Sequence, residues 1–340
     1  ETMSMLSTGP MSEHQQALME KVAKIHAKAE AGDVTSMHKL ATVYRVGAGV
    51  ERDLAKSIHW NRQAADLGHA HAQREMGLWY ARGEGVEKNP VEAVKWFRLA
   101  AEQGHKKAQR DLGVAYIRGE GVPQNIEAAA EWFRTAAEQG DPTAQLHLAH
   151  CFAAGQGLPQ DLARAARWFR AASEQCENET DQAKGLYNLG VCYQLGTGVE
   201  KNMVEAAACF RKAAKMKYGA AQYNIGLCYL TGDGVEKDTT QAVHWFRAAA
   251  EQGHTEKHDD LHAESQFRLG VCYERGDGVA RDVHEAQRWL EAAAEHGHAE
   301  AQALLERLNQ EQSGGGHGHS HGVAARGGGG GGGGAVDSLA

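Results

Sequence analysis

Seven short glycine-rich runs of the form Gly-x-Gly-Val or Gly-x-Gly-Leu recur along this chain of 340 residues. The first four runs are 36 residues apart, and the next three follow after 41, 36 and 44 residues. They lie at Gly47–Val50, Gly83–Val86, Gly119–Val122, Gly155–Leu158, Gly196–Val199, Gly232–Val235 and Gly276–Val279. Self-similarity at a fixed period is typical of repeat proteins, whose units bury their apolar surface against their neighbours. The spacing predicts seven repeats over residues 32–296, with insertions near residues 177–182 and 255–262.

Each repeat contains two apolar patterns of helical period, one on each side of the glycine turn. In the third repeat, Ala108, Leu112 and Tyr116 follow the spacing of a first amphipathic helix. Trp132 and Phe133 belong to a second helix after the turn. An Asp or Asn stands three residues after every valine or leucine, where its side chain accepts hydrogen bonds from the first turn of the second helix. These residues are Asp53, Asn89, Asn125, Asp161, Asn202, Asp238 and Asp282.

The corner after the second helix carries a glycine in five of the seven repeats, which predicts a left-handed helix end. Cys176 and Lys217 take this place in the other two, so we expect corners of a different build there. One tryptophan in each of six second helices needs a cover, which we expect from the helix of the next repeat. These are Trp60, Trp96, Trp132, Trp168, Trp245 and Trp289, with Cys209 in their place in the fifth repeat.

The predicted fold class is therefore all-α: an α/α superhelical solenoid of seven helix-turn-helix repeats with a capping helix at each end. Residues 13–31 are predicted to form the N-terminal capping helix and residues 297–311 the C-terminal one. We expect residues 1–12 to be disordered, and likewise the Gly/His-rich tail over residues 312–340.

The recurring pattern is Ala-x-x-x-Leu-Gly-x-x-Tyr-x-x-Gly-x-Gly-Val, then Asp or Asn, then Ala-x-x-Trp-Phe-x-x-Ala-Ala. It resembles the repeat of the Sel-one-like repeat (SLR) family, an α/α solenoid similar to tetratricopeptide repeats. The resemblance covers about four-fifths of the chain. It implies a non-enzymatic adaptor or scaffold that assembles complexes through a protein or peptide partner. Because one fold hosts many functions, this implication rests on analogy.

Composition excludes several other classes of protein. The net charge is −8 and there is no basic run, which argues against a nucleic-acid partner. No stretch of the sequence reaches the roughly 18 apolar residues of a membrane span. The glycine turns do not extend to a nucleotide-binding loop, and no hydrolase motif occurs, so we expect no catalytic residues and no cofactor.

Cysteine and histidine positions are predicted to be structural. Cys151, Cys192, Cys228 and Cys272 share one repeat position, which indicates small buried residues in a reducing compartment. His254, His258 and His262 are spaced by four residues, but their acidic neighbours favour a solvated face over a metal site. His317, His319 and His321 lie in the tail, where no structural metal site is expected.

We predict the cytoplasm as the compartment. The chain begins with Glu1 rather than Met, which leaves open an upstream signal peptide and a location in the lumen of the endoplasmic reticulum. The alternative function is thus a luminal adaptor in endoplasmic-reticulum-associated protein quality control. Its support is the glycosylation sequon that begins at Asn178. A hydrolase is the second alternative.

A polar residue two positions before the Gly or Ala of each first helix marks the candidate binding surface. We call these seven residues the polar row; they are Lys39, Glu75, Asp111, His147, Asn188, Asn224 and Arg268. We expect the row to line the concave side of the solenoid, where amides can bind an extended peptide backbone. The predicted partner-binding residues are Tyr187, Asn188, Tyr223, Asn224, Phe267 and Arg268.

Trp79 is a further candidate for partner binding. It stands where other repeats have valine, alanine or cysteine, so its side chain is oversized for the position. It either packs into the core or protrudes as an aromatic anchor for the partner, and its helical spacing favours the core.

Overall fold

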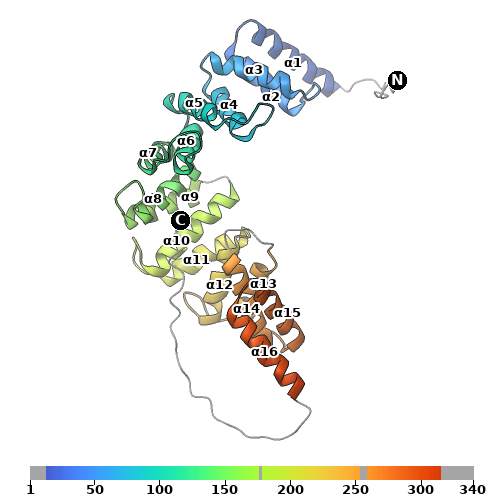
Figure 1. The fold of residues 1–340 in the computed structure, drawn as a ribbon, viewed down its shortest axis with the longest axis vertical. Helices are drawn as coiled ribbons and strands as arrows, with labels where there is room; N and C mark the ends of the chain where they lie inside the picture. Colours follow the sequence, from blue (N-terminus) through green and yellow to red (C-terminus); the bar gives the residue numbers. More distant parts are fainter. Residues whose placement is uncertain (1–12, 176–177, 253–258, 315–340) are drawn as a thin grey trace, which may run out of the picture. The chain divides into compact units, whose positions relative to one another are not determined.

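A computed structural model of the chain describes residues 13–175, 178–252 and 259–314. All regular structure within these residues is helical, so the predicted all-α class is confirmed (Figure 1). The chain divides into two compact units between Ala144 and Gln145. The predictions for residues 1–12 and for the tail beyond residue 314 lie outside the described residues, as does Cys176.

The first unit contains seven complete helices, each packed against the next along the chain (Figure 1). They are α1 (Glu13–Glu30), α2 (Val34–Val46), α3 (Leu54–Asp66), α4 (Ala70–Arg82), α5 (Pro90–Glu102), α6 (Lys106–Arg118) and α7 (Ile126–Glu138). Val22 and Ala29 of α1 join the core of the first repeats, together with Leu40 and Met76. The helix before the first repeat thus supplies an apolar face to it.

Helix α8 (Pro142–Ala154) crosses the division, and the second unit holds the remaining helices. They are α9 (Leu162–Gln175), α10 (Glu179–Leu195), α11 (Met203–Lys215), α12 (Gly219–Thr231), α13 (Thr239–Ala250), α14 (Asp259–Arg275), α15 (Val283–Glu295) and α16 (Ala299–Gly314). Helices α10 and α14 have 17 residues where α12 has 13, so they are longer first helices next to the predicted insertions. Helix α16 includes residues 312–314, which the sequence analysis assigns to the tail.

The two glycines of a turn have different structural roles. In the third repeat, Gly119 ends α6 in the left-handed region with φ 67°, and its N–H donates to the Ala115 carbonyl. Gly121 also has a positive φ of 77°, and a Cβ on it would lie 2.1 Å from the carbonyl oxygen of Pro90. Gly198, Gly234 and Gly278 make the same close contact with the backbone at the start of the preceding second helix, where no side chain fits.

The central core residue is the phenylalanine of the second helix, not the tryptophan before it. Phe133 is completely buried, and a Cβ on Gly113 of α6 would lie 2.7 Å from its ring. The small residue of the first helix thus lets the two helices of the repeat approach closely.

The expectation that the next repeat covers each tryptophan is wrong. Trp132 packs at the edge of the cluster formed by α5 and α6, which are the preceding second helix and its own first helix. Trp245 likewise packs against residues of α11 and α12. Its cover comes from the preceding repeat rather than from the next one.

Most helices of the described repeats begin at a side-chain cap, although Tyr218 before α12 makes no such hydrogen bond. Asn125 accepts a hydrogen bond from the N–H of Ala128 at 2.9 Å, as predicted for the second helix. Three first helices also have histidine caps. In each, the histidine Nδ1 accepts a hydrogen bond from the backbone N–H three residues later in the chain; these histidines are His69, His105 and His298. The recurring histidine after the corner glycine is therefore a helix cap.

The corner at Lys217 is built like the glycine corners. Lys217 adopts a left-handed φ of 60°, and its N–H donates to the Ala214 carbonyl at 3.0 Å. Gly140 makes the matching bond to Ala137 at 2.9 Å. The expectation of a different corner is wrong, because packing of the flanking helices imposes a conformation that costs a lysine about 1 kcal/mol.

A pair of glycine substitutions tests the contact between repeats. Gly121→Ala should lower the free energy of unfolding by at least about 3 kcal/mol, because its methyl group overlaps the backbone of α5. Gly104→Ala is the matched control: its φ is 84°, but no atom lies within 4 Å of the added Cβ, so about 1 kcal/mol is expected. Urea unfolding followed by circular dichroism measures both; equal losses would contradict the contact.

A second prediction concerns pH. Burial, with help from His71 and Arg74, lowers the pKa of His105 to about 4, although Asp111 opposes the shift. Between pH 6.5 and about 4 the unfolded chain therefore binds a proton that the folded chain does not, so stability falls as the pH falls through this window. His105→Asn keeps a capping side chain but removes the titration. Its urea midpoint should fall less between pH 7 and pH 5 than that of the wild type, and an identical fall would contradict this assignment.

Candidate functional site

Four members of the polar row lie in the second unit, on successive first helices. His147 is on α8, Asn188 on α10, Asn224 on α12 and Arg268 on α14, and each is partly exposed. Amide and guanidinium groups at one repeat position offer donors and acceptors in sequence, as an extended peptide backbone requires. The placement of this row on a concave face stays a prediction.

A carboxylate that the sequence analysis missed, Glu264, organises the C-terminal end of the row. Its Oε1 accepts hydrogen bonds from the Arg268 Nε at 2.7 Å and from the Tyr223 hydroxyl at 3.3 Å. Its Oε2 lies 2.8 Å from the His298 Nε2. Because the His298 Nδ1 accepts from the Ala301 N–H, the proton of the neutral ring is on Nε2 and points at Glu264. The four-residue spacing between Glu264 and Arg268 on one helix was the available sequence signal.

The charge of Glu264 is stabilised from two sides. Burial raises its pKa, but the hydrogen bond from His298 and the nearby Arg268 outweigh burial and hold the pKa below its ordinary value. Arg268 also lies over the Phe267 ring, 5.8 Å from its centroid. Arg268 is therefore oriented and partly neutralised by Glu264.

The two asparagines of the row, Asn188 and Asn224, are less strongly paired than Arg268. The Asn188 Nδ2 donates to the Lys184 carbonyl of its own helix at 2.9 Å, and its side chain also bonds His150. Burial raises the pKa of Tyr187, and a hydrogen bond with Asn224 opposes that shift. The two asparagines are thus tied to neighbours of the same unit while part of each side chain faces solvent.

Two predicted contact residues belong mainly to the core. Tyr223 is 8% exposed and Phe267 is 9% exposed. The Phe267 ring stacks on His298 with 4.4 Å between centroids. These rings support the surface from below, whereas Tyr187, Asn188, Asn224 and Arg268 are partly exposed and form the accessible part of the candidate site.

Trp79 is not part of an accessible surface. Its side chain is 4% exposed and joins the core cluster of the first repeats with Met37, Leu40 and Met76. The structure therefore fits the core interpretation, and Trp79 does not protrude as an anchor.

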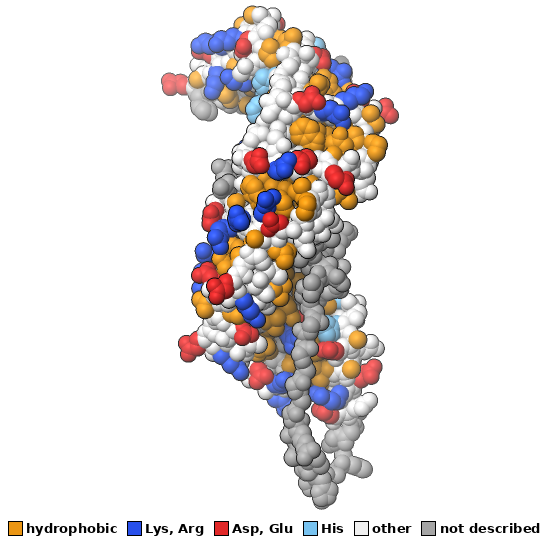
Figure 2. All heavy atoms as spheres, turned by 90° about the vertical axis from the view of Figure 1, so that its left-hand side faces the viewer, with side chains coloured by type: hydrophobic (Ala, Val, Ile, Leu, Met, Phe, Trp, Pro, Cys, Tyr) orange, Lys and Arg blue, Asp and Glu red, His pale blue; other side chains and the backbone are white. Residues whose placement is uncertain are grey.

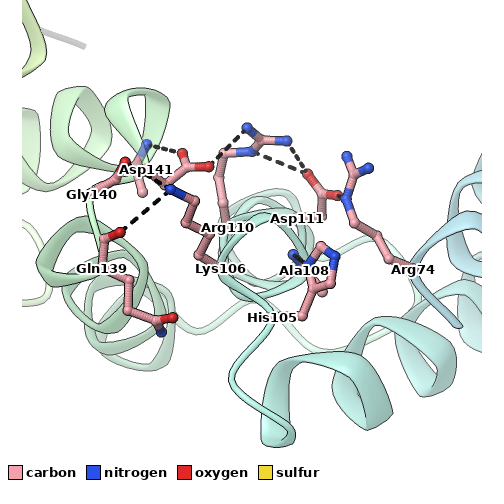
Figure 3. Close-up of polar contacts among 10 residues, drawn as sticks. Arg74, His105, Lys106, Ala108, Arg110, Asp111, Gln139, Gly140 and Asp141 are labelled. Atoms are coloured by element: carbon pink, nitrogen blue, oxygen red, sulfur yellow. Dashed lines mark hydrogen bonds and ion pairs between the residues drawn. The ribbon is translucent and has the colours of Figure 1, made fainter. Parts of the chain in front are cut away.

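In the first unit one member of the polar row, Asp111, is neutralised by the chain itself. Asp111 accepts from the Arg74 Nε at 2.7 Å and from Arg110 at 2.9 Å, and Arg110 also reaches Asp141 at 3.4 Å (Figure 3). Lys106 donates to the carbonyl oxygens of residues 139 and 140. This alternating network joins α4, α6 and the capped start of α8, so its charges stabilise the stack of repeats.

Four histidines of the first unit lie close together. The His105 Nε2 is 3.0 Å from the His71 Nδ1, and the rings of His38 and His69 are 4.7 Å apart. No group of three or more His, Cys, Asp or Glu side chains in the described part of the chain has an arrangement that could hold a metal ion. Of the predicted histidine face in the seventh repeat, His262 is described, while His254 and His258 lie outside the described residues.

The five described cysteines are free and buried. Burial raises the pKa of Cys151, Cys209, Cys228 and Cys272 to about 11, so these thiols stay protonated at neutral pH. Asn178, the first residue of the sequon, caps α10 by accepting from the Thr180 N–H at 2.9 Å.

The molecular surface mixes charges of both signs. On the face drawn in Figure 2, basic and acidic side chains of the described residues alternate with apolar patches. A protein that binds nucleic acid through phosphates instead gathers its basic residues on one face. Among the helices described, none is both long and apolar enough to cross a membrane.

Comparison with known proteins identifies the repeats. The Sel1 repeat pattern matches residues 34–69, 70–105, 106–141, 142–175, 183–218, 219–254 and 263–298. No curated protein sequence matches the chain.

Two crystal structures are similar over most of the chain. A protective antigen of uropathogenic Escherichia coli with an SLR fold is 33% identical, with a TM-score of 0.78 over 86% of this chain. The chain spans 60% of the length of that antigen. A Sel1 repeat protein from Oxalobacter formigenes is 32% identical, with a TM-score of 0.65 over 87% of this chain and 82% of its own. The predicted seven-repeat solenoid is thereby confirmed, and the chain belongs to the Sel1 repeat family.

Proposed function

We propose that this Sel1 repeat protein is a non-enzymatic scaffold that binds a segment of a partner protein along the first helices of repeats five to seven. Sel1 repeat proteins commonly serve as protein-interaction scaffolds. The observation that carries the specific proposal is the series Asn188, Asn224 and Arg268, which are partly exposed at one repeat position on α10, α12 and α14. The bound segment would lie across the helices and exchange backbone hydrogen bonds with the two amides.

Support for this end of the row comes from its contrast with the first unit. Asp111 there is enclosed between two arginines of the chain, whereas neither Asn188 nor Asn224 has a charged partner among the contacts of the described residues. Arg268 is oriented by Glu264 and gives the site one cationic end. We therefore expect a partner segment with a carboxylate near the Arg268 end.

The buried free cysteines bear on the compartment. Free thiols at one repeated core position favour a reducing environment, so we place the protein in the cytoplasm. The luminal alternative requires glycosylation at Asn178, and a mobility shift on deglycosylation of the native protein would favour it.

The binding proposal is tested by selecting linear peptides against the wild-type chain from a random displayed library. Asn188→Ala combined with Asn224→Ala should lower the affinity for the selected peptides by about thirtyfold, since the loss of two hydrogen bonds costs about 2 kcal/mol of binding free energy. The measurement is isothermal titration of the selected peptides. The control is Lys201→Ala with Lys237→Ala, two exposed turn residues of the same unit, which should leave binding unchanged. Failure to select any peptide, or equal binding to both double variants, would contradict the proposal.

A further inference from the structure

The fifth repeat departs from the other six at one core position. Cys209 of α11 stands where the other second helices have a tryptophan. In the next repeat that tryptophan, Trp245, packs against α11 and α12, which are the preceding second helix and its own first helix. By the same register, the indole missing from the fifth repeat would lie against α9 and α10.

A pocket occupies this place in the structure. It has a volume of about 470 Å³ and lies between α9, α10 and α11. Its apolar wall consists of Leu186, Leu189, Tyr193, Cys209 and Met216. The Arg170 guanidinium donates to the Tyr193 hydroxyl at 2.6 Å and fixes one side of the opening. The seven-fold repeat thus provides its own comparison: where the fifth repeat lacks the indole of the others, a pocket with room for an indole is open.

The charge beside the pocket changes in the same repeat. Lys215 lines the opening, and every other repeat has a carboxylate at its position. Those residues are Asp66, Glu102, Glu138, Glu174, Glu251 and Glu295. Lys212, one turn earlier, also lines the pocket, and neither lysine makes an ion pair among the described residues. Arg170 on α9 is a third cationic group of the lining, and Glu174, Glu179 and Glu205 line the pocket as well, so the two lysines are the cationic groups that α11 contributes.

We propose that this pocket binds an aromatic side chain of a partner protein, next to carboxylates that meet Lys212 and Lys215. An aromatic anchor in a preformed pocket is the usual energetic centre of a protein interface. The two unpaired lysines determine the neighbouring chemistry, because they complement acidic residues beside the anchor. This surface goes beyond the proposed function: it lies between α9, α10 and α11, and none of Asn188, Asn224 and Arg268 lines it.

The probe is the peptide acetyl-Trp-Glu-Glu-amide, titrated into the full-length protein and followed by nuclear magnetic resonance. Cys209→Trp fills the pocket with the residue of the other repeats and should weaken binding at least about tenfold. Cys209→Ala leaves the pocket open and should retain binding. Thermal unfolding of both variants shows that the fold is kept.

The lysines are tested independently of the pocket. Lys212→Glu with Lys215→Glu should lower the affinity for the same peptide at least about fivefold. The uncharged peptide acetyl-Trp-Gln-Gln-amide should bind the wild type more weakly than the glutamate peptide does. Asn188→Ala with Asn224→Ala should not change binding of the probe, which separates this proposal from the one above. Absence of saturable binding to the wild type, or equal binding to Cys209→Trp, would overturn the pocket. Unchanged binding to the lysine variant would overturn the acidic part of the ligand.

Discussion

Within each unit, the contact between the second glycine of a turn and the backbone of the preceding second helix is the constraint on which the stack depends. At Gly121, Gly198, Gly234 and Gly278 an added Cβ would lie within 2.2 Å of a backbone carbonyl oxygen. Such backbone-to-backbone contact fixes the distance between successive repeats more closely than side-chain packing does. It also explains why a glycine stands at these four positions, since a left-handed φ alone would also admit asparagine at modest cost.

The sequence was sufficient to predict the architecture because every repeat carries the same residue pattern. Period, caps and small residues agree seven times, so local and long-range signals point to one fold. It was not sufficient where the outcome depends on a neighbouring repeat. Lys217 follows the glycine corner because the flanking helices impose it, and Trp132 lies against the preceding repeat because of the direction of stacking.

The candidate site was only partly predictable for a related reason. Helical spacing placed Asn188, Asn224 and Arg268 correctly on successive first helices, but it could not separate an exposed side chain from a ring such as Phe267 that is covered by a later helix. Glu264 accepts from α12, α14 and the start of α16, and such a meeting of three helices has no linear signature. A repeat position that is polar in every repeat of the chain thus indicates a surface. Whether the side chain of a given residue is exposed depends on how the next repeat packs on it.

Within each unit the main contacts join helices that are adjacent in the chain. Tension applied to the ends of such a unit loads these interfaces in series. A repeat at the end of the chain can therefore detach while its neighbours stay folded. We expect a protein of this construction to behave under force as an extensible spring that shortens again as each repeat docks on the next.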